Sequence, residues 1–370
     1  MLKNEMVRRA TKSIFLVDWA LILPVLYLTG IGLVILESID QSLATVEFSM
    51  TTQYIALAIG FVLFIMLSRT DVSTWKRLAP WVYLLSIILL LVTPIVGETA
   101  FGSQRWIQLG SFQIQPSEIA KLGLIAILAL LFTKRKKEVN KPWTILLSII
   151  YVVIPTILVA SQPDLGTAVI YLMLWFALVS ASYLRKSTVF LIAIVVLLTI
   201  PITLPFLAEY QKDRINIFLN PDEDPRGRGY NTIQSSIAVG SGGLTGKGLD
   251  AGSQSQLNFL PSQHTDFIFA VMSEKLGFIG AISVIIAFCV LAVRLFAIAW
   301  SSQFQFGGYV ALGVGILLST QAIVNIGMNL GVIPITGLPL PFISFGGSHI
   351  ITELALIGIV FSSNRPASYR

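Results

Sequence analysis

The segment Leu276–Val293 reads LGFIGAISVIIAFCVLAV and contains no charged side chain. About 20 apolar residues in a helix are enough to cross the hydrocarbon core of a bilayer. A helix that is apolar on every face has to be buried in a large protein core or in a membrane. The segment therefore predicts a membrane-spanning helix.

Nine other stretches are predominantly apolar, and two of them contain charged residues. They are Trp19–Leu36, Thr51–Ser68, Leu78–Val96, Glu118–Thr133, Trp143–Ala160, Gly166–Leu184, Thr188–Leu207, Gly307–Leu330 and His349–Ser363. The alternating pattern of a membrane β-barrel is absent. The sequence thus predicts an all-α integral membrane protein with about ten transmembrane helices. We expect residues 1–370 to form a single polytopic membrane domain.

The composition agrees with this prediction. Of the 370 residues, 55% are hydrophobic and only 12% are charged, about half the charged fraction of a soluble domain. The single cysteine, Cys289, excludes an intrachain disulfide, and the two histidines, His264 and His349, argue against a zinc or haem site. A net charge of +6 fits basic cytoplasmic loops, so no nucleic-acid partner is expected.

The distribution of basic residues predicts the orientation. With the N-terminus in the cytoplasm, most of the 25 Lys and Arg residues fall in cytoplasmic segments, and Arg105 is the sole basic residue in a short outer loop. Ten spans then place both termini in the cytoplasm. No small-x-small cleavage site follows the first apolar run, so we interpret it as a retained helix and not as a signal peptide.

A long outer segment, residues 208–275, precedes the eighth span. It is rich in Gly, Pro, Asn, Asp and Gln but includes the apolar pieces Ile215–Leu219 and Leu257–Leu260. We expect an extracytoplasmic loop with short interfacial helices that cover a cavity. Its glycine-rich stretch 240–248 (GSGGLTGKG) departs from a phosphate-binding P-loop at Ser241 and Gly248, which leaves a turn or a backbone anion nest.

Polar residues near the ends of spans are the candidate functional groups. Glu118 and Lys121 share one helix face, either as a packing ion pair or as groups lining a polar cavity. Arg105 could bind phosphate oxygens or anchor at lipid headgroups beside Trp106. Asp164 could cap the sixth span or face the same cavity.

The stretch 260–270 (LPSQHTDFIFA) places Asp266 before an apolar run. Asp266 could cap a helix, or it could be a carboxylate whose pKa burial raises toward the range of a general base. Glu274 follows about two helical turns later. It could lie on a similar helix face to Asp266, or Glu274 and Lys275 could form a solvated helix junction. Asn325 and Asn329 fit interhelical hydrogen bonds. The segment 331–347 after them is rich in Pro and Gly, so its backbone is irregular. At membrane depth such a backbone is tolerated only where it packs against protein or lines a water-filled cavity.

Taken together, these residues predict an outward-facing polar cavity with Arg105, Glu118, Lys121, Asp164 and Asp266 in its walls. An acid, a base and cations near the outer leaflet suit either chemistry on a lipid-linked phosphate or its transport. The residues alone leave both open.

Six motifs, in order along nearly the whole chain, give the sequence a close resemblance to the SEDS family (shape, elongation, division and sporulation). The motifs are Gly102–Ile107, Gln115–Lys121, Ala160–Thr167, Tyr230–Gly248, His264–Val271 and Leu338–Gly347. The resemblance implies a GT-C-like fold and a peptidoglycan glycosyltransferase of cell elongation. Such an enzyme polymerises lipid II at the outer face of the bacterial plasma membrane, together with a class B penicillin-binding protein.

The resemblance also assigns residues. It places the family's essential aspartate at Asp266, its conserved Glu and Lys at Glu118 and Lys121, and further family positions at Arg105 and Asp164. The expected reaction is a displacement that inverts the anomeric carbon, with Asp266 as general base. Arg105 and Lys121 would neutralise the leaving undecaprenyl pyrophosphate, and Glu118 would orient Lys121. A divalent cation, Mg or Mn, is a candidate cofactor.

Two other functions use the same features. A lipid II flippase would also need polar groups in spans and broken backbone, although its path should continue toward the cytoplasmic side, where the spans are mostly apolar. A non-catalytic scaffold for the penicillin-binding protein would tolerate replacement of Asp266 by Asn.

Overall fold

A computed structural model describes residues 18–42, 48–100, 103–110, 112–203, 205, 209–221, 224, 229–256, 259–303 and 305–364. The basic N-terminal residues Lys3, Arg8, Arg9 and Lys12 lie outside this part, as does Leu207, the predicted end of the seventh span.

Each of the ten predicted spans corresponds to an apolar helix among the described residues. The helices are α2 (Trp19–Ser42), α3 (Met50–Ser68), α4 (Val72–Val96), α5 (Pro116–Lys134), α6 (Pro142–Ser161), α7 (Leu165–Ser180), α8 (Lys186–Thr203), α12 (Ile268–Ser301), α13 (Gln305–Asn329) and α14 (Gly347–Ser363). Seven of them are long and apolar enough to cross a membrane, whereas α7, α8 and α14 are shorter apolar helices. The all-α membrane fold is therefore confirmed.

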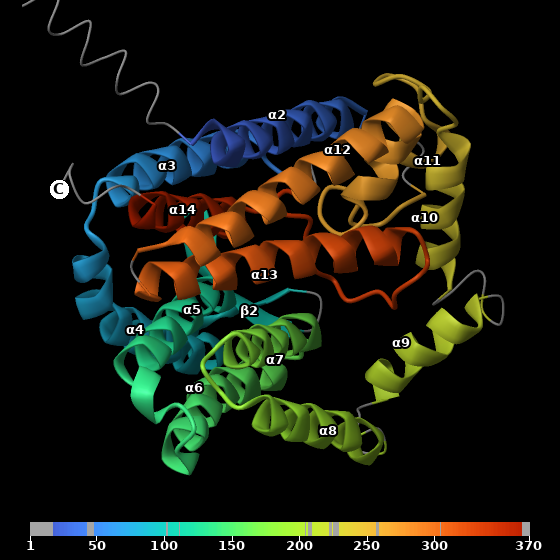
Figure 1. Ribbon diagram of the computed structural model, residues 1–370. Helices are drawn as coiled ribbons and strands as arrows, with labels where there is room; N and C mark the ends of the chain where they lie inside the picture. The colour runs from blue at the N-terminus through green and yellow to red at the C-terminus, as the bar shows by residue number, and fades with distance from the viewer. Residues whose placement is uncertain are drawn as a thin grey trace, which may run out of the picture.

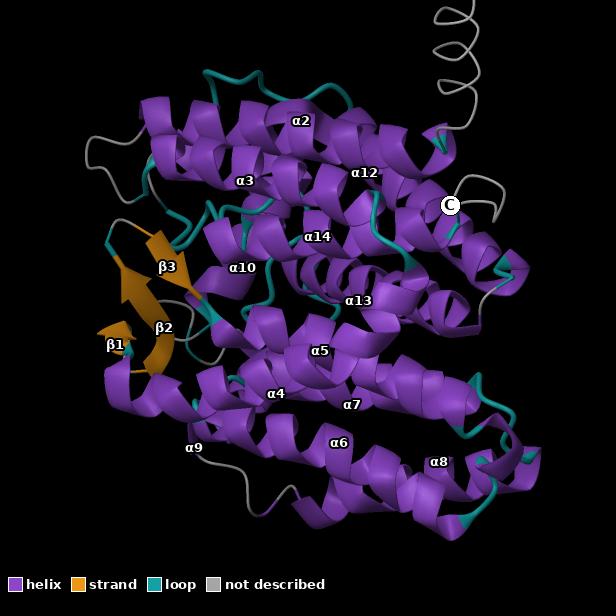
Figure 2. Cartoon of the chain, turned by 90° about the vertical axis from the view of Figure 1, so that its left-hand side faces the viewer, coloured by secondary structure: helices purple, strands orange, loops and turns teal. Residues whose placement is uncertain are grey.

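The helices form a bundle around α5 (Figures 1 and 2). Helix α5 is the most buried of the long helices and packs against α4, α6, α7, α13 and α14, while α12 packs between α13 and α2. Pro116 at the first helical position suits the start of α5, because proline lacks only an N–H that would have no intrahelical partner there. Large hydrophobic side chains such as Trp81, Leu197 and Val293 remain exposed, which suits a lipid environment.

A small antiparallel sheet lies at one end of the bundle, and we call this the sheet end (Figure 2). It consists of β1 (Glu98–Ala100), β2 (Ser103–Leu109) and β3 (Phe112–Ile114), with β2 in the middle. The sequence did not predict these strands, because two of them have only three residues and are too short for their side-chain alternation to stand out.

Between α8 and α12 the structure contains α9 (Glu209–Leu219), α10 (Tyr230–Ser241) and α11 (Ser253–Gln256). Short helices thus occur in the long loop, and their interfacial position stays a prediction. A short 3-10 turn, Lys136–Glu138, joins α5 to α6.

Helix α12 is kinked at Gly277, just where the predicted span begins. Gly277 has φ 67°, and the N–H groups of Phe278 and Ile279 donate to the carbonyls of Gly243 and Leu244 at 2.8 and 3.1 Å. The glycine-rich stretch 240–248 therefore packs its backbone into the kink, where a Cβ at Gly277 would clash with Gly246. The structure supports the interpretation of this stretch as a turn.

Candidate active site

Asp266 lies at the sheet end, two residues before α12 begins. Its backbone carbonyl accepts hydrogen bonds from the Nδ2 atoms of Asn325 and Asn329, at 3.0 and 2.9 Å. Asn329 Oδ1 also accepts from the N–H of Ala270 at 3.1 Å. The two asparagines make the interhelical bonds expected from the sequence, and their target is the backbone that carries the candidate base.

The pKa of the Asp266 carboxyl is raised to about 6: burial is the main cause and the Asp164 carboxylate adds to it, while Arg214 and Arg105 oppose the shift. The residue as a whole is half-buried. Its carboxyl lies beside the backbone of Gly337, where an added Cβ would come within 3.5 Å of Asp266 Oδ2. With a pKa of about 6, the Asp266 carboxyl gains and loses its proton close to neutral pH.

Arg105 and Asp164 meet at the turn between α6 and α7. Arg105, on β2, donates from Nε to the carbonyl of Gln162 at 2.9 Å and also bonds the carbonyl of Pro163. Asp164 accepts from the N–H of Thr167 at 3.2 Å and so caps α7. The structure thus places both predicted residues close enough to act on the charge of Asp266.

The loop between α13 and α14 connects these groups. A Cβ at Gly166, in the first turn of α7, would lie 2.9 Å from the carbonyl oxygen of Thr336. The start of α7 therefore packs closely against the backbone next to Gly337, on which Asp266 also rests. This contact explains why three distant segments share one site.

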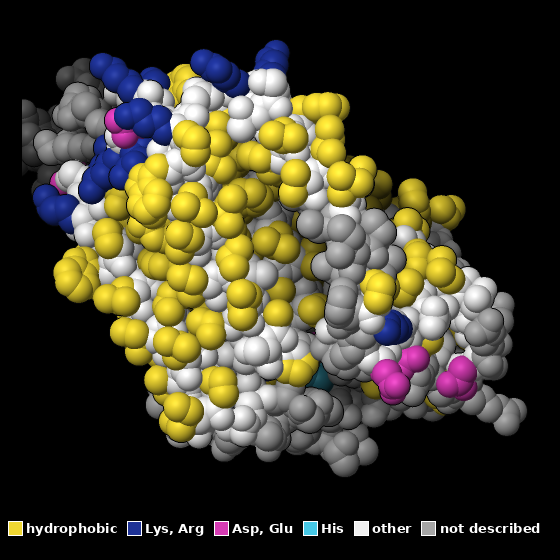
Figure 3. Space-filling view, turned by 90° about the horizontal axis from the view of Figure 1, so that it is seen from below, with side chains coloured by type: hydrophobic (Ala, Val, Ile, Leu, Met, Phe, Trp, Pro, Cys, Tyr) yellow, Lys and Arg dark blue, Asp and Glu magenta, His cyan; other side chains and the backbone are white. Residues whose placement is uncertain are grey.

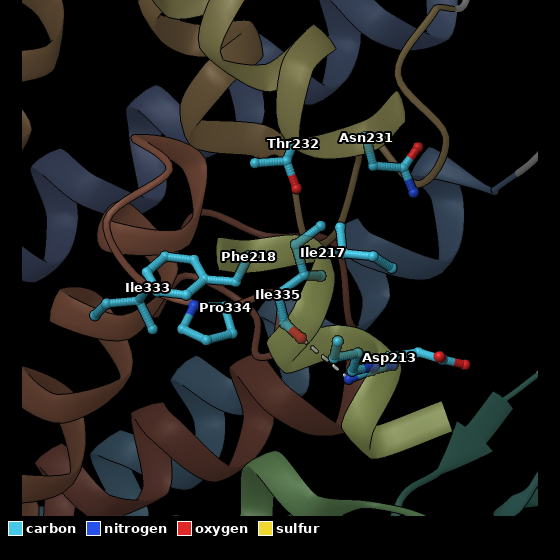
Figure 4. A pocket seen from close by; sticks show the side chains of 9 residues that line it. Asp213, Ile217, Phe218, Asn231, Thr232, Ile333, Pro334 and Ile335 are labelled. Carbon is cyan, nitrogen blue, oxygen red and sulfur yellow. Dashed lines mark hydrogen bonds between the residues drawn. The ribbon is translucent and has the colours of Figure 1, made fainter. Parts of the chain in front are cut away.

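Sequence reasoning missed Arg214, which lies on α9 and is exposed to solvent. Its Nη1 atom donates to the carbonyl of Ile335 at 3.2 Å (Figure 4). It borders a cavity of about 320 Å³ whose other lining residues are Asp213, Ile217, Phe218, Asn231, Thr232, Ile333, Pro334 and Ile335. Arg214 is one of several cations in the long loop, and the sequence held no signal that it acts on the charge of Asp266.

Glu118 and Lys121 form a second cluster, together with His349 and Glu353. Lys121 Nζ lies 2.6 Å from Glu118 Oε1, and both side chains are buried. His349 Nδ1 lies 3.2 Å from the other oxygen of Glu118, and His349 Nε2 lies 2.9 Å from Glu353 Oε1. This geometry supports the ion-pair interpretation of Glu118 and Lys121. The sequence analysis missed Glu353, although a carboxylate inside a predicted span was itself the signal.

Glu274 belongs to neither cluster. It pairs with Lys247 at 2.9 Å and accepts from the N–H groups of Gln254 and Ser255 at 3.1 and 3.0 Å. It therefore holds the glycine-rich stretch and α11 against α12. Among the described residues, no group of three or more His, Cys, Asp or Glu side chains could hold a metal ion on its own.

Fold and site together define an α-helical polytopic membrane protein with a half-buried aspartate and two arginines at one end. The family model described as "Cell cycle protein", named for FtsW, RodA and SpoVE, matches residues 18–369. The chain therefore belongs to this family, the SEDS family, as the motifs indicated.

Relatives and solved structures agree with this assignment. The chain is 39% identical to the peptidoglycan glycosyltransferase MrdB of Escherichia coli K12 over 83% of each protein. It is 36% identical to the probable peptidoglycan glycosyltransferase FtsW of Geobacter metallireducens over 95% of each.

A structure of a peptidoglycan synthase complex that coordinates polymerization and crosslinking superposes with a TM-score of 0.79 at 30% identity, covering 94% of this chain and 97% of the other. The rod shape determining protein RodA of Thermus thermophilus superposes with a TM-score of 0.70 at 28% identity, covering 94% and 96%.

Proposed function

We propose that this chain is a peptidoglycan glycosyltransferase that polymerises lipid II into glycan strands during cell elongation. The observation that carries the proposal is Asp266: a half-buried aspartate whose carboxyl has a pKa of about 6, flanked by Arg105 and Arg214, in a chain of this family. At neutral pH most of this carboxyl is ionised, yet it is more basic than an ordinary aspartate.

In the proposed reaction Asp266 is the general base. The 4-hydroxyl oxygen of the acceptor sugar attacks the anomeric carbon C1 of the lipid-linked donor, while its proton passes to the Asp266 carboxylate. The bond from C1 to the pyrophosphate oxygen breaks, and its electron pair leaves with undecaprenyl pyrophosphate. An α-linked donor gives a β-linked product, so a single displacement with inversion suffices. Holding the two lipids in line supplies several kcal/mol through proximity.

Arg105 and Arg214 are the cations that we assign to the leaving pyrophosphate. Both act on the charge of Asp266, and a guanidinium suits phosphate oxygens. The sequence also assigned Lys121, but Lys121 is buried against Glu118, and this favours a supporting role over phosphate contact.

A divalent cation at this site would need ligands from the substrate as well as from the protein. Magnesium commonly binds through one or two carboxylates plus substrate phosphates, and Asp266 and Asp164 are two carboxylates close enough to influence each other. When bound, the ion would neutralise charge on the pyrophosphate.

The proposed location is the bacterial plasma membrane, with the sheet end outside. Figure 3 supports this orientation, because Lys and Arg gather at one end and hydrophobic side chains cover the middle, whereas the other end shows mainly Asp and Glu with a Lys or Arg beside them. The connections α5–α6 and α7–α8, with the helix ends that border them, supply Lys134, Arg135, Lys136, Lys137, Lys141, Arg185 and Lys186. The similarity to a synthase complex supports a class B penicillin-binding protein as the crosslinking partner.

The test is polymerisation of labelled lipid II by the purified chain in detergent, with a divalent cation, with and without the partner. We expect polymer from the wild type and a loss of about 10²–10⁴-fold in rate for Asp266→Asn. Glu209→Gln removes an exposed carboxylate from α9 and serves as the matched control. Equal polymer from Asp266→Asn and wild type would exclude Asp266 as the base. No polymer from a folded wild-type complex would favour the flippase or the scaffold.

A further inference from the structure

The loop between α13 and α14 contains a strained residue that is held by a buried carboxylate. Phe342 has φ 62°, a left-handed conformation that bulky residues rarely adopt. Its backbone N–H donates to Glu353 Oε2 at 2.8 Å, and both residues are buried. Strain of this kind persists only when the surrounding structure enforces it. Glu353 is one of the groups that hold this turn, together with the hydrogen bond from the N–H of Leu340 to Ser344 Oγ at 2.8 Å.

The same turn contacts the segment that carries Asp266. Ser344 Oγ donates to the carbonyl of Thr265 at 2.7 Å, and the N–H of Phe345 donates to the carbonyl of His264 at 2.9 Å. On the other side of Phe342, the Nδ2 atom of Asn325 bonds the carbonyl of Leu338 at 2.7 Å as well as that of Asp266. A shift of the Phe342 turn therefore moves the backbone of the candidate base.

Glu353 lies next to His349, which stands between it and Glu118: His349 Nε2 is 2.9 Å from Glu353 Oε1, and His349 Nδ1 is 3.2 Å from Glu118 Oε2. The cluster contains two carboxylates and one ammonium, so a protonated His349 balances its charge, and both ring nitrogens then face a carboxylate. Removing one partner from such a buried set leaves an uncompensated charge. The ion pair on α5 is thus connected to the turn by an unbroken series of contacts.

We propose that Glu353 and His349 are positioning residues for the transfer reaction: through the Phe342 turn they hold Asp266 in place and couple it to Glu118 and Lys121. The inference rests on the proposed function for its kinetic readout. Neither residue contacts the reacting atoms, and their role is to fix the conformation of the loop beside the base.

The experiment compares Glu353→Leu, Glu353→Gln and Thr352→Val in the full-length chain with its partner. Glutamine keeps a side-chain oxygen that accepts from the N–H of Phe342, and leucine does not. Thr352 is a buried neighbour on α14 and is the control for general disturbance of that helix. We expect Glu353→Leu to lower kcat at least tenfold with KM for lipid II within about twofold, Glu353→Gln to recover most of kcat, and Thr352→Val to match the wild type.

Hydrogen exchange in the same detergent, without substrate, is the second readout. Glu353→Leu should speed exchange at least tenfold in peptides covering 262–268 and 340–346, and Glu353→Gln should not. Unchanged exchange at 262–268 in Glu353→Leu overturns the positioning role even if polymerisation fails altogether. A kcat loss equal in the leucine and glutamine variants also overturns it. Absence of polymer from the wild type contradicts the proposed function alone, because the exchange result still decides the inference.

Discussion

The two carboxylate clusters of this protein are held in opposite ways. Glu118 is buried, and Lys121 and His349 contact its carboxylate directly and neutralise its charge. Asp266 is held through its backbone carbonyl, which accepts hydrogen bonds from Asn325 and Asn329. The pKa of its carboxyl is lowered by the charges of arginines on other segments. The difference shows how one chain separates a structural carboxylate from one that can exchange a proton: the first is fixed through its side chain and the second through its main chain.

The largest expected effect comes from breaking the matched cluster. Lys121→Met leaves Glu118 buried without its ammonium partner, which should lower the free energy of unfolding by about 3–5 kcal/mol. Unfolding by SDS in detergent micelles measures this effect. The double variant Glu118→Gln with Lys121→Met should recover most of the loss. A single variant as stable as the wild type would show that the pair is not the anchor we describe.

Near Asp266, loss of a cation should affect the rate rather than the stability. Arg214→Gln removes an exposed guanidinium, so we expect polymerisation to fall by about 10–100-fold, the range for a hydrogen bond to a charged group. Lys212→Gln, an exposed cation on the same helix, is the control. Equal losses in both variants would mean that α9 attracts substrate only by its general charge.

The polymerisation rate should depend on pH through Asp266. Because the pKa of Asp266 is raised to about 6, the basic form is lost as pH falls, and the rate should drop about tenfold per pH unit below 6 and be flat above it. Arg214 lowers this pKa, so in Arg214→Gln the acidic fall in rate should begin at a higher pH. Rates measured from pH 4.5 to 8 at saturating lipid II test this, and a flat profile would contradict it.

The same shift has a consequence for stability. A carboxyl whose pKa rises on folding favours the folded state fully below its unfolded pKa and loses that contribution as pH rises through about 6. Asp266→Asn should therefore unfold at a higher temperature than the wild type at pH 7, with the two converging near pH 4. Thermal unfolding at the two pH values measures this. A less stable variant at pH 7 would mean that the charge of Asp266 is better compensated than we infer.

The sequence predicted the helices well and the contacts between them poorly. Apolar runs such as Leu276–Val293 report membrane spans directly, since spanning needs only length and hydrophobicity. The importance of Asp266 came from the family motif, because one aspartate before an apolar run is equally consistent with a helix cap. Arg214 and the Phe342 turn reach Asp266 only through tertiary packing, which leaves no local pattern. Glu353 is different, because its charge inside a span was visible in the sequence.

The smallest expected effect comes from replacing glycines in the segment after α13, and it distinguishes backbone strain from contact with the candidate base. Gly337 and Gly331 both have positive φ, 71° and 72°, in the segment after α13. Alanine at either position should cost about 1–2 kcal/mol, because an L residue is disfavoured in this conformation. Only at Gly337 does the new Cβ approach Asp266 Oδ2, whereas at Gly331 it faces Ser236. We expect similar losses of stability, and a several-fold lower polymerisation rate for Gly337→Ala alone. If Gly331→Ala slows the enzyme as much, strain in the loop, and not contact with the base, limits the reaction.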